Sequence, residues 1–293
     1  MTSEKKLELK RFLIFLALTL AISWIPAIIL NRTVGYHEWF ETNKYPLMAL
    51  PFLYAPAAAN VLTRKLTHED WHDSLLRLNL RGNVRYYVIA VVIVSVVSII
   101  SNVFTTIVEG HADFSDVGKV YNLRQMTGMT VLVLATSPLI AFNTFGEEFG
   151  WRGYMYPKLE KLIGTTGTVI VGGIIWGLWH AVLTVEGHNF GKDYKGYPYL
   201  GMLYMCVLCI FFGMILMWLT ERSGSIYPAA IAHAMLNNGG RAVGMFFLSG
   251  VGEGYDETIG KNMVMEIPTW VICTVFLVLM VRDGRKSIKS KKA

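Results

Sequence analysis

Two adjacent carboxylates and an arginine stand inside a long apolar part of this 293-residue sequence. Glu147 and Glu148 are followed by Arg152, four positions after Glu148. Ionisable side chains at membrane depth are costly and mark functional sites by default. On a helix, Glu148 and Arg152 share a face and can form an ion pair, whereas Glu147 is rotated by about 100° from Glu148. We therefore expect Glu147 to be the carboxylate that remains available for chemistry.

Two further apolar runs carry polar side chains. His180 follows the segment Gly173–Gly177, whose small residues let a neighbouring helix approach, and His233 precedes Asn237 by four positions. Measured from the expected helix ends at 1.5 Å per residue, Glu147, His180 and His233 lie roughly 10–18 Å deep. On one helix, His233 and Asn237 would present polar atoms to the same space. Each residue alone could serve packing, but together they predict a functional polar site.

Such a site could hydrolyse a peptide bond, which requires an activated water, a proton carrier and donors for the oxyanion. Glu147 is the candidate general base, and His180 is the candidate for orienting the water or carrying the proton. His233 and Asn237 are the candidate oxyanion donors. A zinc ion held by Glu147, His180 and His233 is an alternative, because catalytic zinc sites typically have three protein ligands.

The composition indicates a membrane protein rather than a soluble domain. The chain is 53% hydrophobic and 16% charged, whereas soluble domains are about 25% charged. No linker divides it, so we expect one all-α, polytopic membrane domain over residues 1–293, with its functional core at about 130–240. About eight apolar runs are expected to span the bilayer: Phe12–Leu30, Tyr45–Leu62, Tyr87–Val108, a run from Thr130, Thr168–Val185, Tyr199–Leu219, Ile226–Leu248 and Ile267–Val281.

The segments between these runs predict the topology. Thr63–Arg85 is amphipathic and is expected to form an interfacial helix. The fourth run is expected to continue as helix past the glutamates, because no helix breaker lies between Pro138 and Pro157. With the N-terminus inside, 19 of the 27 Lys and Arg residues face the cytoplasm and 8 face the other side, which favours cytoplasmic termini.

The basic clusters favour anionic lipid rather than nucleic acid as the partner. No disulfide framework is expected, because all three cysteines lie in apolar runs: Cys206, Cys209 and Cys273.

The polar residues resemble the motifs of a known family. Glu147–Arg152 matches E-E-x-x-x-R, and His233–Asn237 matches H-x-x-x-N. Trp176–His180 resembles F-x-x-x-H with tryptophan where phenylalanine is usual, which keeps an aromatic residue. Over roughly residues 130–240 the chain is similar to the CPBP (CAAX protease and bacteriocin-processing, or Abi) intramembrane proteases. The resemblance implies an eight-helix fold and an endopeptidase site composed of Glu147, His180, His233 and Asn237, supported by Glu148 and Arg152.

That family includes type II CAAX prenyl endopeptidases, which cleave the last three residues from prenylated proteins, and proteins linked to bacteriocin processing or immunity. The implied substrate is a membrane-associated protein or peptide, either prenylated or bacteriocin-type. We favour a glutamate-activated water over a metal, because the sequence has no compact ligand motif such as H-E-x-x-H. Two other functions stay open: a proton-coupled transporter, since buried Glu and His also form proton relays, and a non-catalytic immunity or scaffold protein.

Overall fold

The computed structural model describes residues 2–42, 44–108, 123–239, 263–264 and 266–290. The elements follow in this order, where η marks a π-helix: α1 (Ser3–Thr33), η1 (His37–Glu41), α2 (Pro46–Leu53), α3 (Ala55–Leu66), α4 (Val84–Val108), α5 (Leu123–Gly150), η3 (Trp151–Met155), α6 (Tyr156–Trp179), α7 (Ala181–Thr184), α8 (Tyr199–Ser223), α9 (Tyr227–Ala234), η4 (Met235–Gly239) and α12 (Ile267–Ser290). The predicted end of the seventh run, residues 240–248, lies outside the described residues, as does most of the loop before α5.

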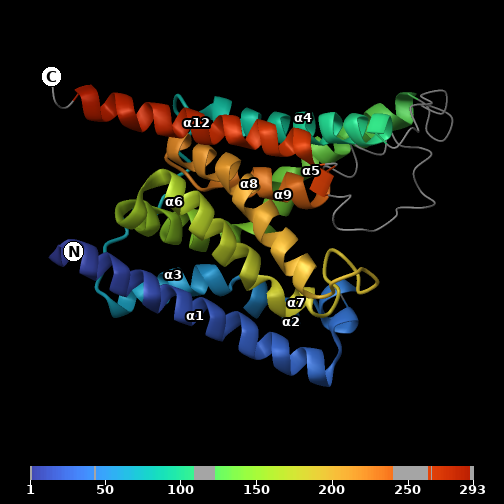
Figure 1. Cartoon of the computed structure of the whole chain (residues 1–293), viewed down its shortest axis with the longest axis horizontal. Helices are drawn as coiled ribbons and strands as arrows, with labels where there is room; N and C mark the ends of the chain where they lie inside the picture. Colours follow the sequence, from blue (N-terminus) through green and yellow to red (C-terminus); the bar gives the residue numbers. More distant parts are fainter. Residues whose placement is uncertain (1, 43, 109–122, 240–262, 265, 291–293) are drawn as a thin grey trace.

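The helices form a bundle with α1 along one face and α4 beside α12 along the opposite face (Figure 1). Between these faces α6 packs on α8, and α9 packs on both α5 and α8. The N-terminus and the C-terminus lie at the same end of the bundle in Figure 1. The elements that carry the candidate site residues, α5, α6 and α9, therefore meet inside the bundle.

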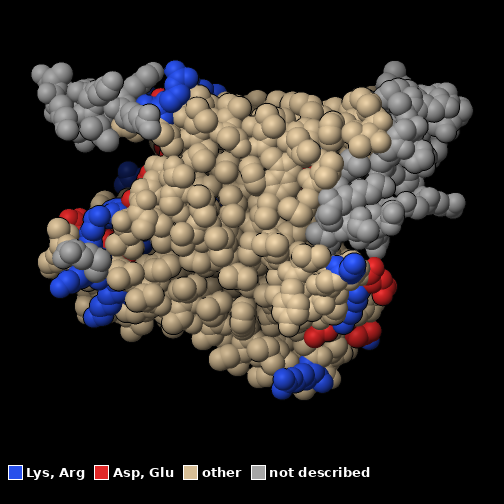
Figure 2. Space-filling view, viewed as in Figure 1, with Lys and Arg blue, Asp and Glu red and all other residues tan. Residues whose placement is uncertain are grey.

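Five helices within the described residues are long and apolar enough to cross a membrane. One of them, Leu139–Thr184, has 46 residues and covers the predicted fourth and fifth runs. Figure 2 shows a broad uncharged surface between two ends of the molecule where charged side chains gather. Large apolar side chains face outward from the bundle, such as Leu139 and Phe142 at 76% and 67% exposure. The chain is thus an all-helical, polytopic membrane protein, as the sequence predicts.

The predicted interfacial helix over Thr63–Arg85 is wrong. α3 ends at Leu66, and residues 67–83 form turns and bends. His68 and Leu75 adopt left-handed backbone conformations, with φ of 49° and 58°, and a right-handed helix cannot continue through such residues. Leu75 instead packs against a small apolar cluster, so the amphipathic pattern reflects a folded loop with one buried side.

The helix that carries the glutamates continues past them, as predicted. α5 leads directly into η3 and α6, and the backbone leaves helical geometry only at Gly164, with φ 75° and ψ 171°. Pro157 lies in the first turn of α6, where a missing N–H is tolerated. The break at Gly164 separates the first arm of α6 from the arm that carries Trp176 and His180.

Two glycines allow α6 and α8 to pack closely, as their spacing predicts. A Cβ atom added to Gly173 would lie 2.5 Å from the Cα atom of Ile210, and one added to Gly177 would overlap the Cα atom of Cys206. The three cysteines are buried and free, in agreement with the expectation from their apolar surroundings. This contact holds the arm of α6 that bears Trp176 against α8.

We expect Gly177→Ala to lower the midpoint of thermal unfolding in detergent, because the new methyl group meets backbone that cannot move aside. Overpacking of this kind costs about 1–3 kcal/mol. Gly128→Ala is the matched control, since a Cβ there would meet nothing within 4 Å and alanine favours the helix. Equal midpoints for the two variants would contradict the close α6–α8 contact.

A buried ion-pair cluster joins three segments at the end of the bundle that holds the N-terminus. Lys158 of α6 forms ion pairs with Glu69, which follows α3, and with Glu8 of α1, the latter at 3.1 Å. Arg11 pairs with the same two carboxylates, at 2.9 Å from Glu8 and 3.4 Å from Glu69. Lys158 and Glu8 are 2% and 4% exposed, so each depends on its partners for compensation.

Replacing Lys158 with methionine is expected to destabilise the fold by about 3 kcal/mol, because the two carboxylates would keep only Arg11 and the longer contact of Glu8 with the exposed Lys161 at 3.8 Å. The measurement is the thermal midpoint of the purified protein. Lys192→Met is the control, since the Lys192–Glu186 pair is 3.2 Å long with both side chains solvent-accessible, and such pairs contribute at most about 1 kcal/mol. A loss no larger than the control's would show that the buried cluster is not structural.

Candidate active site

Glu148 lies at the centre of a buried charge network. Its side chain is fully buried, and Oε1 accepts hydrogen bonds from Arg152 Nη1 at 2.9 Å and from His233 Nδ1 at 2.8 Å. The Glu148–Arg152 pair was predicted from its spacing of four residues, and the structure confirms it. The contact with His233 adds a connection from α5 to α9 that spacing alone does not predict.

The guanidinium of Arg152 is sandwiched between two aromatic rings. Its Cζ atom lies 4.2 Å from the ring centroid of Trp176 and 4.8 Å from that of Tyr156. Cation–π contacts of this kind strengthen when the cation is removed from water, and Arg152 is only 1% exposed. Together with Glu148 they compensate the burial of this charge.

Glu147 has a different environment from its neighbour. Its Oε2 atom accepts hydrogen bonds from two indole N–H groups, that of Trp176 at 2.7 Å and that of Trp151 at 3.4 Å. The side chain is 5% exposed, and within the described residues the ion pairs of this site involve Glu148 instead. The two adjacent carboxylates are therefore separated into a charge-paired one and one held by neutral donors.

Trp176 connects the other residues of the site. Its indole N–H binds Glu147, its carbonyl oxygen lies 2.9 Å from His180 Nδ1, and its ring meets the His233 ring edge-on at a centroid distance of 5.2 Å. Because a carbonyl only accepts, Nδ1 of His180 carries the proton, and Nε2 of the neutral ring keeps a lone pair. Sequence reasoning treated this tryptophan as a substitute for phenylalanine and missed its donor. The sequence did contain a signal for this donor, because Trp176 stands where the motif usually has phenylalanine, and of the two residues only tryptophan carries a side-chain N–H.

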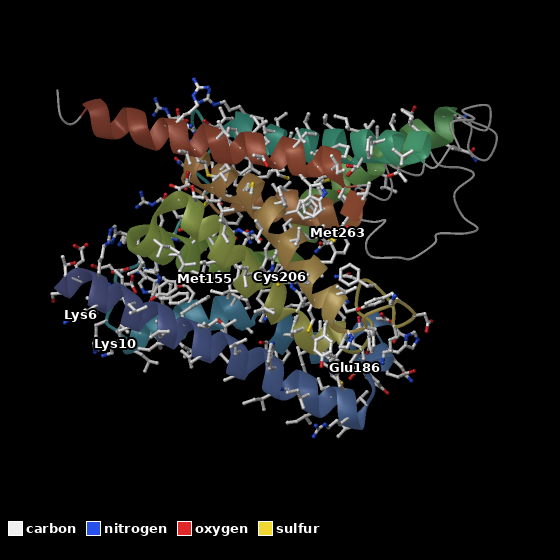
Figure 3. The ribbon with its side chains drawn as sticks, in the orientation of Figure 1. Lys6, Lys10, Met155, Glu186, Cys206 and Met263 are labelled. Atoms are coloured by element: carbon white, nitrogen blue, oxygen red, sulfur yellow. The ribbon has the colours of Figure 1, made fainter. Side chains whose placement is uncertain are left out.

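His188 is a second residue that the sequence did not single out. Its ring lies parallel to that of His180, with centroids 6.3 Å apart, and its Nδ1 is 2.7 Å from the hydroxyl of Tyr36. Burial lowers the pKa of His188 to about 4, so the ring is neutral at pH 7 and accepts the hydrogen bond from Tyr36. Glu186, two residues earlier, is at the opposite end of the molecule from Lys6 and Lys10 (Figure 3). This loop therefore covers His180 from the end away from the termini.

His233 and Asn237 do not face the same space, although residues four apart on a regular α-helix would. His233 is 5% exposed and faces Glu148, whereas Asn237 is exposed and belongs to the π-helix η4. A π-helix has a wider turn than an α-helix, so residues four apart no longer align on one face. The structure places Glu147, Glu148, Arg152, His180 and His233 around Trp176, whereas Asn237 is exposed on η4.

The zinc alternative does not fit the described donors. Across the ranges that the structure describes, no three His, Cys, Asp or Glu side chains are grouped closely enough to hold a metal ion. Glu147, His180 and His233 are grouped around an indole ring, and His233 directs Nδ1 to Glu148. The described positions of these donors therefore do not form a zinc site.

Comparison with known proteins agrees with the motifs. Residues 126–239 match the family described as Type II CAAX prenyl endopeptidase Rce1-like. The chain is similar to CAAX prenyl protease 2 of Methanococcus maripaludis, with 29% identity over 100 residues, covering 34% of this chain and 36% of that protein. It is also similar to Lysostaphin resistance protein A of Staphylococcus haemolyticus, with 27% identity over 128 residues, covering 44% of this chain and 32% of that protein.

These matches span about a third of the length of each curated relative. The matched segment nevertheless contains every candidate site residue from Glu147 to Asn237. Over residues 126–239 the chain is therefore similar to the Rce1-like type II CAAX prenyl endopeptidases.

Proposed function

We propose that this protein is an intramembrane endopeptidase that hydrolyses a peptide bond of a membrane-associated substrate with a water activated by Glu147. The main support for this proposal is that the two adjacent glutamates have different hydrogen-bond partners. Glu148 is engaged by Arg152 and His233, whereas among the described residues Glu147 is held by indole N–H groups and keeps a carboxylate oxygen for a water molecule. A carboxylate so placed can accept the proton of an attacking water.

The proposed reaction begins when Glu147 removes a proton from water and the water oxygen bonds to the scissile carbonyl carbon. His180, held by the Trp176 carbonyl, has Nε2 available to orient this water, or to take the proton from Glu147 and pass it to the leaving amine. The C–N bond then breaks, the amine leaves with that proton, and the new carboxylate retains the water oxygen. Glu147 and His180 are thus each already oriented by a hydrogen bond with Trp176.

His233 and Asn237 are the proposed donors to the oxyanion. With Nδ1 of His233 bound to the Glu148 carboxylate, Nε2 carries a hydrogen only in the protonated ring. Arg152 keeps Glu148 in position against His233. Asn237, which is exposed on η4, can donate through its amide to a substrate that approaches from there.

We also propose the full topology: one membrane domain over residues 1–293 with eight spans and both termini in the cytoplasm. The five long apolar helices are compatible with this number. Dividing Leu139–Thr184 at Gly164 gives a sixth span, and the shorter α2–α3 and α9 give the seventh and eighth. Both termini lie at one end of the bundle, and the basic N-terminal residues gather there. Protease protection of tags fused to each terminus in sealed vesicles would test the orientation.

The substrate class proposed first is a prenylated protein with a C-terminal CAAX sequence, as named for one relative. The test reconstitutes the full chain in liposomes and supplies a farnesylated CAAX peptide. Mass spectrometry should detect the released tripeptide, and the same peptide without the prenyl group tests whether the lipid is required. If neither peptide is cleaved, nor any panel of membrane-inserted peptides, the proposed activity is wrong.

A second candidate follows from the relative named Lysostaphin resistance protein A. In this case the chain would confer resistance without catalysis, by binding a peptide or partner. Protection of cells that persists after simultaneous changes at Glu147, His180 and His233 would favour this function over hydrolysis. A proton-coupled transporter would instead produce substrate-dependent flux in proteoliposomes that Glu147→Gln abolishes.

A further inference from the structure

A cavity of about 210 Å³ lies between the first turns of α6, the last turns of α8 and the loop after α3. Its walls change from buried to exposed along its length. Arg152, Tyr156, Met217 and Thr220 are all less than 5% exposed, whereas Glu221 is exposed. The cavity therefore runs from the surface near the end of α8 to the guanidinium that holds Glu148. This end of α8 lies at the end of the bundle where both termini lie (Figure 1).

Two side chains that line this cavity carry polar atoms without hydrogen-bond partners among the described residues. Arg152 uses Nη1 for Glu148, but its Nε and Nη2 atoms have no hydrogen-bond partner within the described residues, and neither has the hydroxyl of Tyr156. Leaving a buried donor unsatisfied costs about 1–3 kcal/mol, and more for a charged group. Arg152 and Tyr156 both line the cavity and both have polar atoms without hydrogen-bond partners in the described part of the chain, so we expect the cavity to hold a polar molecule.

The charges around the cavity decide which polar occupant fits. The positive charge of Arg152 is already paired with Glu148, and two carboxylates, Glu160 and Glu221, line the outer part. These carboxylates would repel an anion that entered the cavity, and Arg152 has no unpaired positive charge to bind it. A hydrocarbon chain would leave the donors of Arg152 and Tyr156 unsatisfied. A small neutral molecule that both donates and accepts meets these conditions.

We propose that the cavity is a hydrated pocket that carries water from the cytoplasmic end of the protein to the Arg152–Glu148 pair. Water occupies about 30 Å³ per molecule in the liquid, so the volume admits several molecules, and three polar groups are enough to hold a buried water. The guanidinium at its deep end contacts the Trp176 ring, whose indole N–H binds Glu147. The pocket thus ends one side chain from the proposed base, and its role in supplying water rests on the proposed hydrolytic function.

Hydroxyl-radical footprinting with X-ray radiolysis tests the hydration directly, because bound water generates radicals beside the residues it touches. Met217 lines the pocket and Met214 does not, yet both are on α8 and are only 3% and 5% exposed. We expect Met217 to be oxidised several-fold faster than Met214 in the full-length protein in lipid nanodiscs. Equal rates would overturn the proposal without reference to any variant.

Two variants of Thr220 refine the test. Thr220→Met should fill the pocket and slow the oxidation of Met217. Thr220→Val keeps the volume of the pocket and should leave the oxidation rate of Met217 unchanged. Protection of Met217 by added acetate would show that the pocket takes a carboxylate, and oxidation that appears only after lipid is removed would show an acyl chain. Either result would overturn the assignment of water. Footprinting needs no turnover, so a hydrated pocket in a protein that cleaves nothing would refute the proposed function alone.

Discussion

Replacing Glu147 with glutamine is expected to lower kcat for peptide cleavage by roughly 10²–10⁴-fold, the usual contribution of a general base. Glutamine has nearly the same shape, and its amide oxygen can still accept the hydrogen bond from Trp176, which is 2.7 Å from the carboxylate in the native protein. The fold should therefore survive while the proton acceptor is lost. The measurement is the initial rate of tripeptide release under saturating substrate.

The matched control is Glu186→Gln, which changes a solvent-accessible glutamate in the loop after α7. We expect this variant to cleave at the native rate and to unfold at the native temperature. A Glu147→Gln protein that retains more than a tenth of the native kcat would remove Glu147 from the role of base. In that case Glu148 would have to act despite its bonds to Arg152 and His233.

The second large effect is expected for Trp176→Phe, although phenylalanine is the residue usual in the motif. This change keeps an aromatic ring beneath Arg152 but deletes the N–H that binds Glu147. A hydrogen bond to a charged group contributes about 1.5–3 kcal/mol, which corresponds to roughly 10- to 100-fold in rate if it is fully expressed in the transition state. We expect kcat to fall within this range while KM changes little, because the indole acts on the base and not on the substrate.

Trp179→Phe separates this positioning role from general destabilisation. Trp179 lies on the same helix, is 1% exposed, and donates its indole N–H to Ser23 Oγ at 3.0 Å, so its loss removes a comparable buried hydrogen bond. The two variants should lose similar stability, yet only Trp176→Phe should lose kcat in the stated range. Equal rates for both variants would mean that the Trp176–Glu147 bond has no part in the reaction.

Much of the fold could be predicted because a bilayer requires uninterrupted apolar helices. The cores of α1, α4, α8 and α12 coincide with the apolar runs. Gly173 and Gly177 predicted the close approach of a neighbouring helix, and the structure identifies that helix as α8. The Glu148–Arg152 pair could also be predicted, since residues four apart on a helix must be neighbours. These features depend on local spacing alone.

Contacts between distant segments could not be predicted in this way. The partners Trp176 and Glu147 are 29 positions apart, and Lys158 and Glu69 are 89 apart, so their contacts depend on how helices rotate and dock. The segment over 67–83 has an amphipathic composition, but its left-handed residues and its contacts with the bundle give a loop. Composition records which residues prefer burial, and it does not specify the backbone that buries them.

A single-turnover reaction in water labelled with oxygen-18 tests the role of Glu147 most directly. Excess protein is mixed with a farnesylated CAAX peptide, and mass spectrometry reads the oxygen content of the new C-terminal carboxylate. If Glu147 activates water, the first product formed carries one labelled oxygen and the protein carries none. If Glu147 attacks the carbonyl and water then opens the resulting anhydride at the Glu147 carbonyl, the first product carries unlabelled oxygen and the label appears on Glu147, which would contradict the account.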